Sequence, residues 1–194
     1  MKLHAARLIL VLFVLPFALL AVVETGVAGR KTKDRVIVVS GPKQQRRIGS
    51  YYYVREHGHG SEYAAAKRAF GAPTSRKVNL STSCELSWRS LGLEIEFFAY
   101  GSTHCSGSSL IKGSTMYSSR VTSPIWRTDL GLRVRDSESR LRSLYPGAKH
   151  GSRSAPFSPR EWWTLATEKG HILLVANVKA GRVTSFEIIS PFAE

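Results

Sequence analysis

The apolar residues of this chain form one long run near the start and short alternating stretches after it. The long run extends from Leu8 to Val23, with Pro16 as its one interruption. Basic Arg7 precedes the run, and small residues such as Ala28 follow it. This order of basic, apolar and small residues is the layout of a secretory signal peptide. Residues 1–29 are therefore expected to form a signal peptide, or an N-terminal anchor if they are not removed.

The length of the run favours removal. It is shorter than the roughly 20 residues that a helix needs to cross the bilayer. Pro16 also disfavours a regular helix through its middle. Removal and retention both place the rest of the chain outside the cytoplasm, as a secreted protein or as one held at the membrane by this segment.

After the run, the chain repeats one order of patterns. A helix capped by Ser61 is expected over residues 61–70, and a second helix, capped by Asp136 or Ser137, over residues 136–145. A strand hairpin follows the first helix over 84–99, where solvent-facing Glu94 and Glu96 alternate with apolar residues. A three-stranded meander follows the second helix over 162–189. Three pairs of apolar residues lie 75 positions apart: Ala66 and Leu141, Phe70 and Tyr145, Trp88 and Trp163.

These patterns predict an α+β fold, built from two helix-plus-antiparallel-hairpin or meander half-repeats that share one core. The expected organisation has four parts. They are the signal or anchor segment (1–29), a basic linker that contains a strand (30–50), the first half-repeat (51–120) and the second half-repeat (121–194). Residues 106–124 are rich in serine and glycine and are expected to form the crossover between the halves.

The chain is strongly basic, with 28 Lys and Arg against 14 Asp and Glu and a net charge of +14. Such a charge attracts polyanions. Outside the cytoplasm, the expected partners are an anionic polymer, an anionic lipid surface or an envelope protein. Specific nucleic-acid binding is not expected, since the aromatic residues do not alternate with the cations. Arg46, Arg47, Arg160 and Trp162 are the candidate binding surface, and the oligomeric state stays open.

Two cysteines, Cys84 and Cys105, are the whole cysteine content. In an oxidising compartment an isolated pair is most simply a disulfide. A loop of this size would stabilise the fold by roughly 3 kcal/mol in the chain-entropy treatment. A nucleophilic Cys105 helped by His104 is disfavoured, because neighbouring residues of an extended chain point to opposite sides.

No catalytic or metal site emerges from the sequence. His57 and His59 are the only close histidine pair and lack the further ligands that zinc requires. No serine lies in a G-x-S-x-G elbow, and no nucleotide-binding glycine motif is present. We therefore expect no catalytic residues, metal or cofactor. Trp88 and Trp163 are expected as core anchors, and Trp162 as a side chain on the other face.

One stretch resembles a known motif. It consists of Trp126-Arg127-Thr128, then Gly131 to Ser137, then Leu141, Leu144 and Tyr145-Pro146-Gly147-Ala148. This W-R-T…G-L-R-V-x-D-S…Y-P-G-A pattern resembles one found in small exported bacterial proteins. Their tandem arrangement is more loosely similar to β-lactamase-inhibitor-like and SmpA/OmlA (BamE-type) modules, in which a short helix packs on an antiparallel sheet. The resemblance implies a fold and an exported location, and it carries no catalytic residues. Arg135 stands where the motif usually has glycine.

The leading hypothesis is an exported, non-catalytic module that binds a protein or an anionic envelope component through its sheet face. Binding needs shape, aromatic residues and charge, and the chain has all three. The looser resemblance suggests an alternative, an inhibitor of an exported hydrolase. A second alternative is a small hydrolytic enzyme that uses His57, His59 or His104.

Overall fold

The computed structural model describes residues 35–40, 45–53, 61–80, 83–99, 114–153 and 160–190. They belong to one compact unit, Thr32–Glu194. The predicted signal or anchor segment lies outside the described residues. Within them, no helix has both the length and the apolar character needed to cross a membrane.

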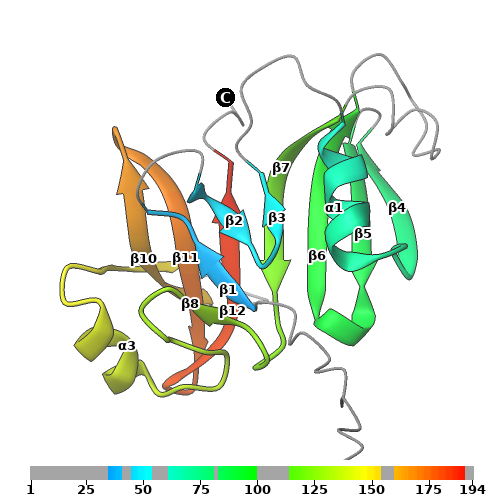
Figure 1. Cartoon of the computed structure of the whole chain (residues 1–194). Coiled ribbons are helices and arrows are strands. Elements are labelled where there is room, and N and C mark those ends of the chain that lie inside the picture. Colours follow the sequence, from blue (N-terminus) through cyan, green and yellow to red (C-terminus); the bar gives the residue numbers. More distant parts are fainter. Residues whose placement is uncertain are drawn as a thin grey trace, which may run out of the picture. The chain divides into compact units, whose positions relative to one another are not determined.

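Eight strands form one antiparallel sheet in the order β4-β5-β6-β7-β12-β11-β10-β9 (Figure 1). They are β4 (Ser75–Leu80), β5 (Ser83–Trp88), β6 (Leu93–Ala99), β7 (Ser114–Val121), β9 (Lys149–Arg153), β10 (Arg160–Glu168), β11 (His171–Lys179) and β12 (Arg182–Ile189). The pairing of β7 with β12 lies at the centre and joins the first half of the chain to the second.

A second, smaller sheet has the order β3-β2-β1-β8. Its strands are β1 (Val36–Val38), β2 (Arg47–Ile48), β3 (Tyr51–Tyr52) and β8 (Arg127–Thr128), and β1 and β8 run parallel. Within the described ranges, the helices are α1 (Glu62–Phe70), the 3-10 turn η2 (Arg89–Leu91) and α3 (Glu138–Leu144). Both α-helices begin as the sequence predicts: Ser61 accepts a hydrogen bond from the backbone N–H of Ala64, and Ser137 from that of Arg140.

The small sheet and both α-helices pack against the same face of the large sheet (Figure 1). Residues directly opposite each other in an antiparallel sheet project to one side. One such row crosses the sheet from β5 to β10 and faces the core. It contains Trp88, Leu93, Val121, Phe186, Ala176 and Trp163. The other face carries the alternate residues.

The predicted α+β fold class is wrong. The helices have only nine and seven residues, and strands dominate the described chain. The two halves do not form separate hairpin units, because β7 and β12 pair and make one continuous sheet. The error arose in the expected crossover, where Ser114–Val121 is a central strand. Its serines are typical of a loop, yet Ser114 and Ser119 are buried by the surrounding structure.

The basic segment 30–50, expected to be a linker with one strand, contains two strands in its described part, β1 and β2. Ile37 and Ile48 pair across these strands and are fully buried. Arg46 is also buried, at 4 % exposure. The segment therefore contributes to the core, and Arg46 is not part of an accessible binding surface.

Arg46 is held by an ion pair. Its Nη1 lies 2.7 Å from Oε2 of Glu168 at the end of β10. The hydrogen bond that Arg46 donates to this carboxylate is the main cause that raises the pKa of Arg46, against the opposing effect of burial. The pair fastens the segment before β2 to the second half of the large sheet.

We expect Glu168→Ala to lower the free energy of unfolding by about 2–3 kcal/mol, because it removes this carboxylate from a buried guanidinium. Urea denaturation measures the loss. The matched control is Arg140→Ala, which breaks the exposed pair of Arg140 with Asp136 and should cost less than about 1 kcal/mol. Equal losses in the two variants would show that the Arg46 pair does not fasten the segment.

Arg135, where the motif usually has glycine, adopts a left-handed conformation with φ 78°. Its N–H donates to the carbonyl of Val183 at 2.8 Å, which fixes the turn before α3. A left-handed conformation costs a non-glycine residue about 1–2 kcal/mol. Arg135→Gly should therefore stabilise the protein by about 1 kcal/mol in chemical denaturation. Ser143→Gly, at an exposed position of α3 without positive φ, should destabilise the protein. A gain in both variants would contradict this explanation.

Candidate binding groove

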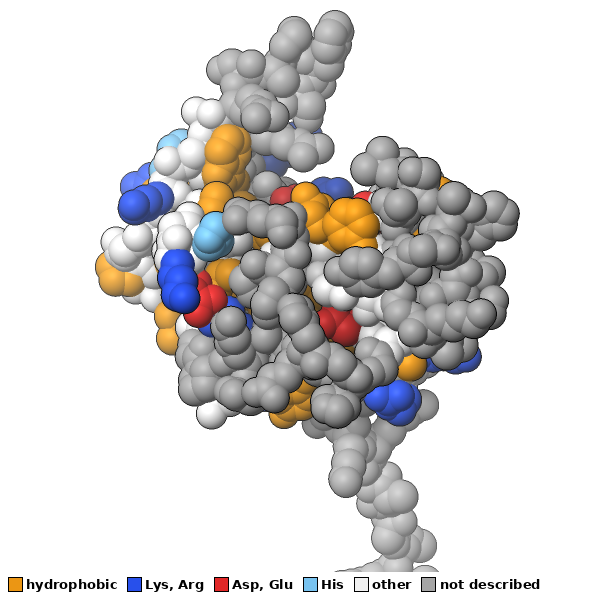
Figure 2. All heavy atoms as spheres, turned by 90° about the horizontal axis from the view of Figure 1, so that it is seen from above, with side chains coloured by type: hydrophobic (Ala, Val, Ile, Leu, Met, Phe, Trp, Pro, Cys, Tyr) orange, Lys and Arg blue, Asp and Glu red, His pale blue; other side chains and the backbone are white. Residues whose placement is uncertain are grey.

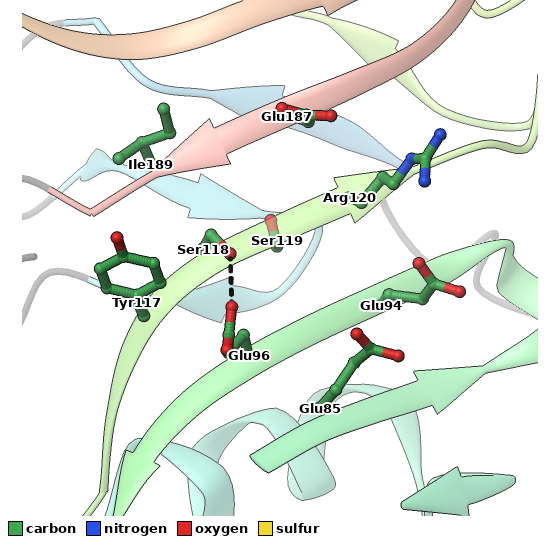
Figure 3. A pocket seen from close by; sticks show the side chains of 9 residues that line it. All are labelled: Glu85, Glu94, Glu96, Tyr117, Ser118, Ser119, Arg120, Glu187 and Ile189. Carbon is green, nitrogen blue, oxygen red and sulfur yellow. Dashed lines mark hydrogen bonds between the residues drawn. The ribbon is translucent and has the colours of Figure 1, made fainter. Parts of the chain in front are cut away.

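A groove of about 360 Å³ lies on the outer face of the large sheet, the face that α1, α3 and the small sheet leave uncovered. Four neighbouring strands, β5, β6, β7 and β12, build it (Figure 3). Its lining residues are Glu85, Glu94, Glu96, Tyr117, Ser118, Ser119, Arg120, Glu187 and Ile189.

The register of the sheet brings these side chains together. Arg120 of β7 lies directly opposite Glu94 of β6 and Glu187 of β12. Glu85 of β5 lies directly opposite Glu96 of β6. Since opposite residues share a face, all five charged side chains project from the same side. Figure 3 shows the charged end of the groove at Glu94 and Arg120, and an apolar end at Tyr117 and Ile189.

The groove is acidic although the protein is basic. Four carboxylates line it, out of 14 acidic residues in the chain. Like charges directly opposite each other, as at Glu85 and Glu96, destabilise a sheet. Glu96 is partly compensated, because it accepts hydrogen bonds from Ser83 Oγ at 2.8 Å and Ser118 Oγ at 3.4 Å.

Two charged groups of the groove are available to a ligand. Glu94 and Arg120 have no hydrogen-bond or ion-pair partner within the described part of the chain. Glu187 accepts from Nδ2 of Asn177 at 3.0 Å. Seen from above Figure 1, Lys and Arg side chains are visible both at the outline of the molecule and beside carboxylates farther in (Figure 2).

The apolar end has an aromatic wall. Tyr117 packs edge-to-face on Phe98, with ring centroids 5.1 Å apart. Ile189 lies beside it in the lining. An acidic end next to an aromatic and aliphatic end suits a ligand with cationic and apolar groups. Among the described residues, no set of three or more His, Cys, Asp or Glu side chains could hold a metal ion.

The tryptophan predictions are confirmed. Trp88 is 3 % exposed in the core, and Trp163 packs against the core from β10. Trp162 lies in register with Asn177 and Gly151, on the outer face. It is half-buried and belongs to β10, so it is not part of the groove lining.

The predicted basic binding surface is not brought together. Arg46 is buried, as described above, and Arg47 is half-buried and donates to the carbonyl of Gly49 at 2.7 Å. The side chain of Arg160 lies outside the described residues. The sequence therefore predicted a binding surface made of basic side chains, whereas the accessible groove of the structure is lined mainly by carboxylates.

Several other candidates fall on residues that the structure does not describe. These are Cys105, His57, His59 and His104. Cys84 is 2 % exposed, and no described cysteine is free. The Cys84–Cys105 disulfide stays a prediction.

The sequence identified part of the groove. Its alternation correctly placed Glu94 and Glu96 on the solvent-facing side of β6. It missed Arg120 and Glu187, because they meet only through the pairing of β7 with β12, which are distant in sequence. It also missed Glu85, although β5 pairs with its sequence neighbours β4 and β6. Ser114–Val121 has no regular apolar alternation, because two of its buried positions are serines, Ser114 and Ser119. No local signal therefore marks a strand there.

No protein-family model and no curated protein sequence matches this chain. Two solved structures are distantly similar. A cysteine-rich secretory protein from Staphylococcus aureus subsp. aureus Mu50 has 9% identity and a TM-score of 0.42, over 80% of this chain and 50% of that one. An extracellular protein containing an SCP domain from Bacillus anthracis str. Ames has 8% identity and a TM-score of 0.39, over 79% and 50%. The chain thus aligns with about half the length of each.

The indole ring of Trp162 packs against the backbone of Gly151. A Cβ atom at Gly151 would lie 2.5 Å from Cε2 of Trp162. Gly151→Ala should therefore displace the indole and lower the free energy of unfolding by about 1–3 kcal/mol. Gly147→Ala, where a Cβ meets nothing within 4 Å, is the control and should change stability by less than about 1 kcal/mol. Urea denaturation of both variants tests this, and equal stabilities would disprove the contact.

Proposed function

We propose that this protein is an exported, non-catalytic binding module, and that it holds a basic segment of a partner protein in the groove of its large sheet. The N-terminal signal pattern supports an extracytoplasmic location. The concentration of four carboxylates in one groove of a protein of net charge +14 carries the proposal.

The net negative charge of the groove lining favours a cationic partner over an anionic one. Opposite charges a few ångströms apart attract by about 1–4 kcal/mol at the dielectric constants of a protein surface, and like charges repel by as much. An anionic polymer on this face would meet Glu85, Glu94, Glu96 and Glu187. A lysine or arginine side chain would meet them favourably, and its apolar neighbours would contact Tyr117 and Ile189.

Arg120 gives the groove a second specificity element. It lies between Glu94 and Glu187 in the register and is exposed. A guanidinium surrounded by carboxylates suits a ligand in which one acidic or carbonyl group accompanies the basic ones. Polypeptide segments offer this combination, since their carbonyl groups accept hydrogen bonds next to cationic side chains.

The test titrates the full chain with an oligolysine peptide and, separately, an oligoglutamate peptide. Backbone amide NMR shifts locate the contact. We expect oligolysine to shift amides of β5, β6, β7 and β12, despite the net positive charge of the protein. Glu94→Lys should weaken this binding roughly tenfold, because it reverses one charge in the groove.

Glu161→Lys is the matched control, since it makes the same charge change at an exposed position of β10. It should weaken binding less than threefold, by general repulsion alone. Shifts outside the groove, equal effects of the two variants, or tighter binding of oligoglutamate at these strands would refute the proposal.

A further inference from the structure

The W-R-T…G-L-R-V stretch forms a small hairpin, here called the motif hairpin (residues 125–134). Arg127 and Arg133 face each other in an antiparallel bridge. Thr128 N–H donates to the carbonyl of Leu132 at 2.9 Å, and Thr128 Oγ1 accepts from Leu132 N–H at 3.1 Å. Gly131 turns the chain with φ 87°. The motif residues thus form this hairpin, and none of them lines the groove.

The motif hairpin has a buried side and an exposed side. Trp126, Thr128 and Leu132 are fully buried. Their alternate neighbours project outward, and Leu130 lies at the tip of the turn. The exposed side chains are Ile125 (45 %), Arg127, Leu130 (52 %) and Arg133. The hairpin therefore presents two exposed aliphatic side chains and two exposed arginines on one short segment.

The two arginines are uncompensated. Like charges directly opposite each other destabilise a strand pair, and neither Arg127 nor Arg133 has an ion-pair or hydrogen-bond partner for its guanidinium within the described residues. The nearest carboxylates in sequence do not pair with either guanidinium. Asp129 accepts from Ser40 Oγ at 2.9 Å. Asp136 accepts from the backbone N–H of Arg133 at 2.8 Å and pairs with the side chain of Arg140 at 3.1 Å. An anion from outside the protein would relieve the repulsion.

A third basic side chain, Arg35, lies beside the motif hairpin. The guanidinium carbon of Arg35 lies 5.0 Å from the ring centroid of Trp126, and partial burial lowers the pKa of Arg35. The backbone ties it to the hairpin, because Arg127 N–H donates to the carbonyl of Arg35 at 3.0 Å. Arg35 is the first described residue of the chain. From Ala28, near the end of the predicted signal or anchor segment (1–29), an extended chain reaches Arg35 within about 25 Å.

We propose that the motif hairpin docks on an anionic phospholipid membrane, with Leu130 and Ile125 entering the interface and Arg127, Arg133 and Arg35 binding lipid phosphates. This surface is separate from the groove and does not depend on the proposed function. Arginine recognises phosphate through paired N–H donors. Aliphatic side chains gain from leaving water at the headgroup boundary, which a soluble polyanion does not offer.

The test places a polarity-sensitive dye at Leu130→Cys in the full chain. Vesicles of phosphatidylcholine are compared with vesicles rich in phosphatidylglycerol. We expect a blue shift on the anionic vesicles, which high salt reverses. The same dye at Ile172→Cys, another exposed aliphatic position, should not shift. Because each arginine near an anionic surface contributes about 1 kcal/mol, Arg127→Gln with Arg133→Gln should lower the docked-to-undocked ratio roughly 30-fold.

Lys149→Gln with Lys169→Gln is the matched control, which removes the same charge elsewhere and should lower the ratio less than threefold. Far-UV circular dichroism checks that each variant is folded. The dye at Ile172→Cys checks that vesicle binding does not shift the dye at every exposed aliphatic position. The proposal is overturned by the absence of a shift at position 130, by equal shifts at positions 130 and 172, or by equal losses in the two double variants. An equal shift with soluble polyphosphate would also overturn it, in favour of a soluble polyanion.

Discussion

The pairing of β7 with β12 is the interaction on which the rest of this structure depends. It joins two sequence-distant sets of strands into one sheet, so that core residues from both halves lie in continuous rows from Trp88 to Trp163. Without it, each half would have an exposed strand edge and half of a core. The small sheet and the two helices then need to cover only one face, and Trp126 and Phe70 meet there at 6.1 Å between ring centroids.

The part of the other face at β5, β6, β7 and β12 carries the groove, and the same pairing determines its chemistry. Glu187 and Arg120 are neighbours only because β12 lies beside β7. The groove therefore lies at the junction of the two halves. A sheet face built in this way is rigid, since its side chains project from paired strands and not from loops. Such a face suits recognition of a partner by shape and charge.

Acidic and basic side chains cluster at different places on the protein. Its carboxylates include a cluster in the groove, whereas uncompensated arginines gather at the motif hairpin. Net charge alone predicts only attraction to polyanions, and it predicts nothing about a local acidic site. The motif hairpin also explains the sequence motif physically: Trp126, Thr128 and Leu132 anchor it in the core, and the residues between them face outward.

The sequence alone determined the local elements. Serine caps at Ser61 and Ser137 set the starts of both helices, and alternation set the strands around Glu94 and Glu96, because these signals depend on neighbours along the chain. The fold class and the groove were decided only by the tertiary structure. Ser114–Val121 is a strand because partners on both sides satisfy its backbone, and Arg46 is buried because Glu168, far away in sequence, compensates it. Such long-range pairings leave no local pattern in a single sequence, which is why they appear only in the folded chain.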